Sequence, residues 1–69
     1  MINWVRYERA KKRISQEDLA HALEVSRHSI IGVETERYEP SCQLAMKIAK
    51  YFNKKVEDIF FLSEEDVPK

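Results

Sequence analysis

The sequence predicts an all-α domain of five short helices. Apolar residues recur at helical spacing in several short segments, and three of these segments follow a serine that can cap a helix. One glycine, two prolines and 35% charged residues among 69 positions are typical of a compact helical protein. We expect residues 1–69 to form a single domain, because a chain of this length supports one core only.

The first two predicted helices have clear starting points. The first covers residues 5–12 and follows a short extended segment, residues 2–4. The second begins after Ser15, whose hydroxyl can accept a backbone N–H, and Asp18 completes a pattern like that of a capping box. The apolar face of this helix consists of Leu19, Ala20 and Leu23.

The third and fourth helices follow Ser26 and Ser41 in the same way. The third covers residues 27–35. Residues 36–41 form a loop, because Pro40 disfavours helix at the residue before it. The fourth has the clearest apolar stripe of the chain, formed by Leu44, Ala45, Ile48, Ala49 and Phe52.

The last segments close the predicted fold. Asn53 can adopt the left-handed conformation that ends the fourth helix, and a fifth helical turn covers residues 56–60. The two ends of the chain, "INWV" and "FFLS", are short and apolar and contain residues that prefer strands. We expect them to pair as a small two-stranded antiparallel sheet that holds the termini.

Residues 16–35 form two predicted helices joined by a tight turn, with a small side chain, Ala20, at the crossing point. This is the pattern of a helix-turn-helix, in which the first turn of the second helix faces outward. An α-helix fits the major groove of DNA, which is about 12 Å wide, and its first-turn side chains can reach base edges. The pattern predicts double-stranded DNA as the partner and residues 27–35 as the reading helix.

From Val5 to Phe60 the chain resembles the Xre family of small regulators, of the Cro and phage-repressor type. The segments that carry the resemblance, in order and in register, are SQEDLA, LEVSRHSI, GVE, YEPS, LAMKIAKYF and VEDIF. Within this family, the chain looks most like the short single-domain bacterial repressors of the cytolysin-operon type, which are dimers of five-helix bundles with a small antiparallel sheet. The resemblance implies a phage-repressor-like fold and a transcriptional regulator.

The resemblance also implies roles for individual residues. Base contacts are implied for Arg27, His28 and Ser29, and a bidentate pair between Arg27 and guanine would contribute about 1–3 kcal/mol of discrimination. Phosphate contacts are implied for Gln16, Ser26, Arg37 and Tyr38. Arg9 and Glu34 match a structural pair that in the family links the first helix to the end of the reading helix.

Several positions depart from the family's pattern. Glu24 stands where the family very often has glycine, and a positive φ there would cost about 1 kcal/mol. Gly32 falls at an outward position that elsewhere often carries a base-contacting side chain. Glu36 replaces the glycine of the common Asn-Gly, and Glu39 adds a carboxylate close to the expected phosphate path. We expect these last three residues to lower the affinity for DNA rather than to change the fold.

Trp4, Phe61 and Leu62 predict a homodimer interface. A chain of this size can hardly bury all of its seven aromatic side chains, so an apolar patch near the paired ends is a natural two-fold contact. The alternative is that Trp4 simply covers the end of the bundle. A dimer would place two reading helices about 34 Å apart, which matches a near-palindromic site.

Other classes of function fit less well. Catalysis by His28 with neighbouring serines would need a pocket and an orienting third group, so we expect no enzyme. The single cysteine fits a reducing cytoplasm and leaves no metal site, and we expect neither metal nor cofactor. The N-terminal stretch lacks the long apolar run of a signal peptide or a membrane span.

We therefore expect a cytoplasmic, nucleoid-associated homodimer that represses transcription by occupying a promoter. The net charge is zero, but residues 1–14 carry five basic side chains against Glu8 alone. The main alternative is an antitoxin-like or adaptor module that uses the same fold to bind proteins. The zero net charge and the carboxylates of Glu36 and Glu39 keep that alternative open.

Overall fold

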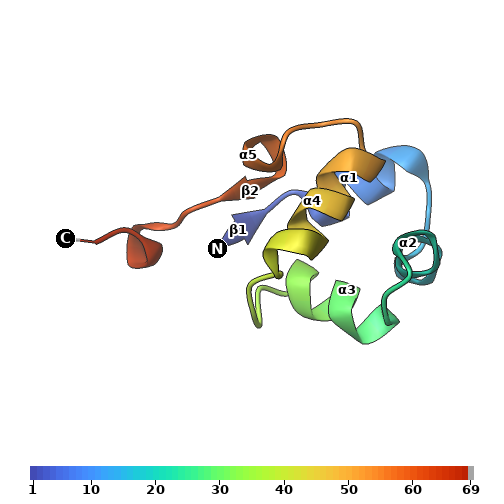
Figure 1. Ribbon diagram of the computed structural model, residues 1–69, viewed down its shortest axis with the longest axis horizontal. Helices are drawn as coiled ribbons and strands as arrows, with labels where there is room; N and C mark the ends of the chain where they lie inside the picture. The colour runs from blue at the N-terminus through green and yellow to red at the C-terminus, as the bar shows by residue number, and fades with distance from the viewer. Residues whose placement is uncertain (69) are drawn as a thin grey trace.

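The helices and strands follow one another in the order expected from the sequence (Figure 1). The computed structural model describes residues 1–68, and its helices are α1 (Val5–Lys12), α2 (Gln16–Leu23), α3 (Arg27–Glu34), α4 (Cys42–Tyr51) and α5 (Val56–Ile59). Two short strands, β1 (Ile2–Asn3) and β2 (Phe60–Phe61), and a 3-10 turn, η1 (Glu64–Asp66), complete the described part of the chain. The prediction of an all-α fold with a small sheet is confirmed.

Serine caps begin the three middle helices, as predicted. The Ser15 hydroxyl accepts the backbone N–H of Asp18 at 2.9 Å, and the Asp18 carboxylate accepts the backbone N–H of Ser15 at 3.0 Å. The hydrogen bond from the backbone N–H of Ser15 holds the pKa of Asp18 below its ordinary value, because it stabilises the carboxylate. Ser26 and Ser41 each accept the backbone N–H three residues further on, and so cap α3 and α4.

The first four helices end alike, and none of them uses glycine to do so. Each is followed within two residues by a left-handed residue: Arg13 (φ 56°), Glu24 (58°), Glu36 (60°) and Asn53 (56°). The residue after each of these donates its N–H to the carbonyl five positions back, which is the Schellman pattern of helix termination. Glu24 thus has a positive φ, the conformation for which a non-glycine residue carries a steric cost.

One apolar core joins all five helices. The side chains of Val5, Leu19, Ile30, Ile48 and Ile59, one from each helix, are fully buried. The predicted stripe of α4 is buried over its whole length, from Leu44 to Phe52. Ala20 is also buried, in the helix that packs against α3, and its small side chain allows the close crossing that the sequence predicts.

The two ends of the chain pair as predicted, beside the helical bundle (Figure 1). Strands β1 and β2 are antiparallel, with Ile2 opposite Phe61 and Asn3 opposite Phe60. The Asn3 side chain also donates from Nδ2 to the carbonyl oxygen of Val33 at 2.8 Å, so the sheet is tied to the end of α3. The sequence pattern does not predict η1, which lies beyond β2.

Candidate nucleic-acid interface

The start of α3 is the part of the helix-turn-helix that faces outward. Arg27 and His28 are exposed, whereas Ile30 and Val33, further along the same helix, are buried. Ser29 is only partly exposed, and its hydroxyl lies 2.9 Å from that of Ser26, the capping residue. Two of the three residues expected to contact bases are therefore free to reach a partner, while Ser29 is held against its own cap.

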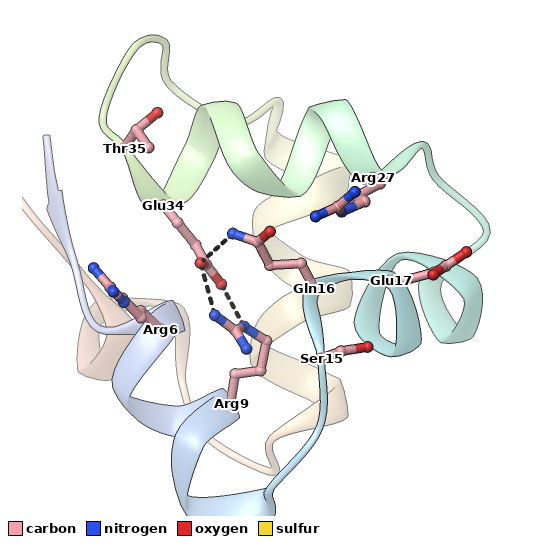
Figure 2. Close-up of a pocket in the computed structure, with 8 residues that line it drawn as sticks. All are labelled: Arg6, Arg9, Ser15, Gln16, Glu17, Arg27, Glu34 and Thr35. Carbon is pink, nitrogen blue, oxygen red and sulfur yellow. Dashed lines mark hydrogen bonds and ion pairs between the residues drawn. The ribbon is translucent and has the colours of Figure 1, made fainter.

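A hydrogen-bonded cluster behind α3 holds three segments together (Figure 2). Arg9 from α1 donates to both carboxylate oxygens of Glu34, from Nε at 2.8 Å and from Nη2 at 3.1 Å. Gln16, at the start of α2, donates from Nε2 to Glu34 at 3.1 Å. The hydrogen bond to Glu34 raises the pKa of Arg9, because the carboxylate stabilises the guanidinium.

Burial makes this cluster a rigid connection. The side chain of Glu34 is 3% exposed and that of Arg9 is 16% exposed, so solvent screens the pair only weakly. Arg9 also donates from Nη1 to the carbonyl oxygen of Ile14 at 2.9 Å, which fixes the turn between α1 and α2. The structure thus places Arg9 and Glu34 where the end of α3 meets α1.

A polar cleft of about 650 Å³ opens beside this cluster (Figure 2). Its walls come from α1, the start of α2 and both ends of α3, and the residues are Arg6, Arg9, Ser15, Gln16, Glu17, Arg27, Glu34 and Thr35. Arg9 is neutralised by Glu34, but Arg6 and Arg27 are both exposed on the cleft. Two cations beside the N-terminus of α2 suit an anion such as a phosphate group.

Sequence reasoning did not single out Arg6 as a binding residue. The sequence indicates only that residues 1–14 are rich in basic side chains, and it does not show where any one of these side chains points. Only the fold shows that Arg6 lines the same cleft as Gln16 and Arg27. Gln16 lies in this cleft as well, although its side-chain amide is already engaged with Glu34.

The loop after α3 corrects one expectation from the sequence. Gly32 does not point freely outward: it is buried, and the ring of Tyr38 covers the place where a side chain at residue 32 would stand. Arg37 is exposed and its backbone N–H donates to the carbonyl of Gly32 at 3.0 Å. Glu36 and Glu39 are also exposed, so this loop carries two carboxylates beside one cation.

The apolar residues at the paired ends are exposed. Trp4 keeps 49% of its surface exposed, Phe61 38% and Leu62 64%, and the rings of Trp4 and Phe61 meet edge to face with centroids 6.2 Å apart. Tyr7 meets Trp4 in the same manner on the neighbouring turn of α1, and it is 56% exposed. We call Trp4, Tyr7, Phe61 and Leu62 the terminal patch.

The part of the chain that the structure describes holds neither a cluster of metal ligands nor a helix able to span a membrane. Within residues 1–68, no group of three or more histidine, cysteine or acidic side chains is placed to hold a metal ion. In the same part of the chain, every helix is too short or too polar to cross a membrane. Cys42 is exposed at the start of α4 as a free thiol.

Comparison with known proteins identifies similar chains in archaea and bacteria. A family model described as Helix-turn-helix matches residues 5–59. An uncharacterized HTH-type transcriptional regulator of Methanocaldococcus jannaschii is 48% identical over 66 residues, which are 96% of this chain and 100% of the relative. A second, of Archaeoglobus fulgidus, is 48% identical over 59 residues, covering 86% of this chain and 83% of the relative. The uncharacterized HTH-type transcriptional regulator YgzD of Bacillus subtilis is 42% identical over 66 residues, which are 96% of this chain and 100% of the relative.

Proposed function

This chain belongs to the helix-turn-helix family, and from that premise we propose that it is a sequence-specific DNA-binding transcriptional regulator that acts as a homodimeric repressor. The names of its relatives, all HTH-type transcriptional regulators, support a regulatory role. Membership of this family also agrees with the expectation that the chain is not an enzyme. We treat residues 1–69 as one DNA-binding domain with its helix-turn-helix at residues 16–35.

The observation that carries the proposal is the exposed start of α3 on a rigid support. Arg27 and His28 project from the first turn, while the opposite face of the helix is buried and its end is held by Glu34. In a major groove, side chains in this position reach base edges. Arg27 would pair with guanine, and His28 and Ser29 would contact neighbouring bases.

Phosphate groups on either side of the groove would be held by the cleft and by the loop after α3. The N-terminus of α2 offers backbone N–H groups beside Gln16, and Arg6 adds a cation to the same cleft. Ser26, Arg37 and Tyr38 would contact the backbone from the turn before α3 and from the loop after it. These contacts set the orientation of α3 and carry no base preference.

The terminal patch would form the dimer interface. Its four side chains are large, apolar and at least one-third exposed, which is the composition of a two-fold contact. A dimer would present two copies of α3 about 34 Å apart to one face of a near-palindromic operator. Repression would follow from occupying a promoter in the cytoplasm, as in the cytolysin-operon type of repressor.

An antitoxin-like or adaptor role is the second candidate, because carboxylates stand near the expected phosphate path. Glu17 lines the cleft, and Glu36 and Glu39 are exposed in the loop after α3. Like charges beside a phosphate backbone weaken binding. If the same face binds a protein instead, these carboxylates become contacts rather than obstacles.

Selection from random duplex DNA, followed by a salt titration, separates the two roles. We expect the chain to enrich a near-palindromic sequence and to bind it with an affinity that falls steeply as salt rises, because phosphate contacts release counterions. An adaptor would enrich no sequence and would bind DNA weakly at every salt concentration. That result would remove the DNA-reading proposal.

A further inference from the structure

Tyr38 follows α3 in the chain but packs back onto that helix. Its hydroxyl lies 3.2 Å from the backbone carbonyl oxygens of both His28 and Ser29 and donates to them. A methyl group placed on Gly32 would overlap ring atoms Cε1 and Cζ and the hydroxyl oxygen of Tyr38. Tyr38 therefore occupies the space that a side chain at residue 32 would fill.

The covered part of α3 belongs to the face expected to enter the groove. Residues four apart lie one above the other on a helix, so Gly32 stands on the same face as His28. Ile30 and Val33 are buried on the opposite side. Tyr38 is 48% exposed. Its aromatic ring therefore forms the outer surface of α3 at residue 32, where glycine has no side chain of its own.

The backbone after α3 fixes this arrangement. Glu36 is left-handed (φ 60°) and its N–H donates to Val33, while the N–H of Arg37 donates to Gly32. This Schellman termination reverses the chain directly after the helix. Tyr38 is thus delivered onto α3 by hydrogen-bonded backbone and not by a free loop.

We propose that Tyr38, seated on Gly32, is a specificity-determining residue that reads a thymine methyl group in the middle of each operator half-site. Its ring edge takes the place of a side chain at residue 32, and aromatic groups contact the C5-methyl of thymine in the major groove. Its hydroxyl holds the turn that carries His28 and Ser29. This inference rests on the proposed function and gives Tyr38 a base contact in place of the phosphate contact.

Two substitutions remove the ring from this position by different routes. Gly32→Ala displaces the exposed end of the Tyr38 side chain and breaks its hydrogen bonds to His28 and Ser29. Alanine favours the helix more than glycine does, so α3 is retained. Tyr38→Ala removes the ring directly and carries the test if Gly32→Ala does not fold. Tyr38→Phe removes only the hydroxyl, and Tyr51→Phe is the matched control on α4.

The test uses the operator obtained from random duplex DNA, with each thymine replaced in turn by deoxyuridine, which lacks the methyl group. We expect one replacement per half-site to weaken wild-type binding about fourfold, the effect of one buried methyl group. Gly32→Ala and Tyr38→Ala should lose this sensitivity. Tyr38→Phe should keep it but bind the operator a few-fold more weakly, and Tyr51→Phe should match the wild type.

Each contrary result overturns the inference in a recognisable way. If no thymine is sensitive in the wild type, or if both ring-displacing variants keep the wild-type sensitivity, Tyr38 reads no base. If the wild type enriches no sequence at all, the proposed function fails and this inference fails with it.

The packing of Tyr38 on Gly32 can be measured without DNA. The Tyr38 ring should shift the Gly32 Hα resonances in the NMR spectrum, and Tyr38→Ala should abolish that shift.

Discussion

At the residue scale, Glu34 is the point at which three segments of the chain converge. Its carboxylate accepts from Arg9 of α1 and Gln16 of α2 while it closes α3. Its side chain is 3% exposed, and both carboxylate oxygens accept hydrogen bonds. This one carboxylate therefore links the end of α3 to both α1 and α2.

Glu34→Gln should lower the free energy of unfolding by about 2–4 kcal/mol. This range lies above the value for an exposed pair and overlaps the lower part of the range for a buried pair that loses one partner. The guanidinium of Arg9 would remain largely enclosed without its counter-charge. Urea unfolding followed by circular dichroism measures the change. Glu17→Gln removes an exposed carboxylate from the first turn of α2, where it interacts favourably with the helix dipole, and should lower the free energy of unfolding by about 1 kcal/mol at most. Equal effects of the two substitutions would contradict the structural role of Glu34.

Sequence reasoning reached this scale only in part. Arg9 and Glu34 are 25 positions apart, so no local pattern pairs them, and only the family resemblance did so. Gly32 lies on the face expected for it but is buried under Tyr38, because helical spacing places a residue on a face and does not show what packs over it. The covering residue, Tyr38, comes from a loop whose reversal depends on Glu36, a residue type with little preference for the left-handed conformation.

At the scale of the elements, helix starts were more predictable than helix ends. Serine caps are a local chemical signal, and all three predicted caps are present. The left-handed residues that end the helices include arginine and glutamate, which carry no such signal. The turn η1 was missed although it has a local signal, because the Asp66 carboxylate accepts from the backbone N–H and the hydroxyl of Ser63, as in a Ser-x-x-Asp cap. The Met1 amine also lies 3.0 Å from this carboxylate, and that contact has no local sequence signal.

The turn between α2 and α3 should be strained at Glu24. Glu24→Gly should raise the free energy of unfolding by about 1 kcal/mol, because glycine adopts a positive φ without the steric cost of a Cβ. Glu24→Ala keeps the Cβ and removes the charge, so it separates strain from electrostatics. Urea unfolding of both variants measures the difference. A gain of the same size in Glu24→Ala would show that charge, and not φ, is responsible.

The link between Met1 and η1 should hold only within a window of pH. Hydrogen bonds from the backbone N–H of Ser63 and, second, from the Met1 amine lower the pKa of Asp66 from 3.8 to about 2. The contribution of ionised Asp66 to the stability of the fold is therefore complete above pH 3.8 and is lost as pH falls toward 2. The hydrogen bond to Asp66 raises the pKa of the Met1 amine above 8.0. The contribution of the protonated amine to the stability of the fold is therefore complete below pH 8.0 and is lost as pH rises through the raised pKa.

Amide NMR shifts of Ser63 and Asp66, followed from pH 2 to pH 10, measure this window. Both resonances should be constant between the two limits and should move at each end. Asp66→Asn should remove the transition at low pH. A wild-type protein in which Asp66 titrates at its ordinary pKa of 3.8 and the Met1 amine at 8.0 would show that the terminus is not bound to η1.

At the scale of the whole molecule, the arrangement of five helices and the paired ends could be predicted because many weak signals agree along the chain. Caps, apolar stripes and strand-like termini all specify the same fold, and the structure has it. The composition of the cleft could not be predicted, since Arg6, Gln16 and Arg27 come from three helices. Assembly was inferred from exposed apolar surface, and the same surface gives the next prediction.

Trp4→Ala should weaken dimerisation at least tenfold. Tryptophan at the centre of an interface typically contributes 2 kcal/mol or more, and Trp4 contacts both Tyr7 and Phe61 in the terminal patch. Sedimentation velocity over a range of concentrations gives the dissociation constant. Met46→Ala truncates an apolar side chain on α4 that is 59% exposed, and it should leave the dimer intact. A monomeric wild type would refute the interface.

The central claim is that the exposed start of α3 reads bases while the cleft beside it holds phosphate. The measurement that tests it most directly compares Arg27→Ala with Gln16→Ala on the selected operator and on its single-base-pair variants. We expect Arg27→Ala to lose about 1–3 kcal/mol of preference at one base pair of each half-site, and Gln16→Ala to weaken binding to every sequence alike. If Arg27→Ala weakens all sequences uniformly, or leaves the preference at every base pair intact, the start of α3 does not read DNA.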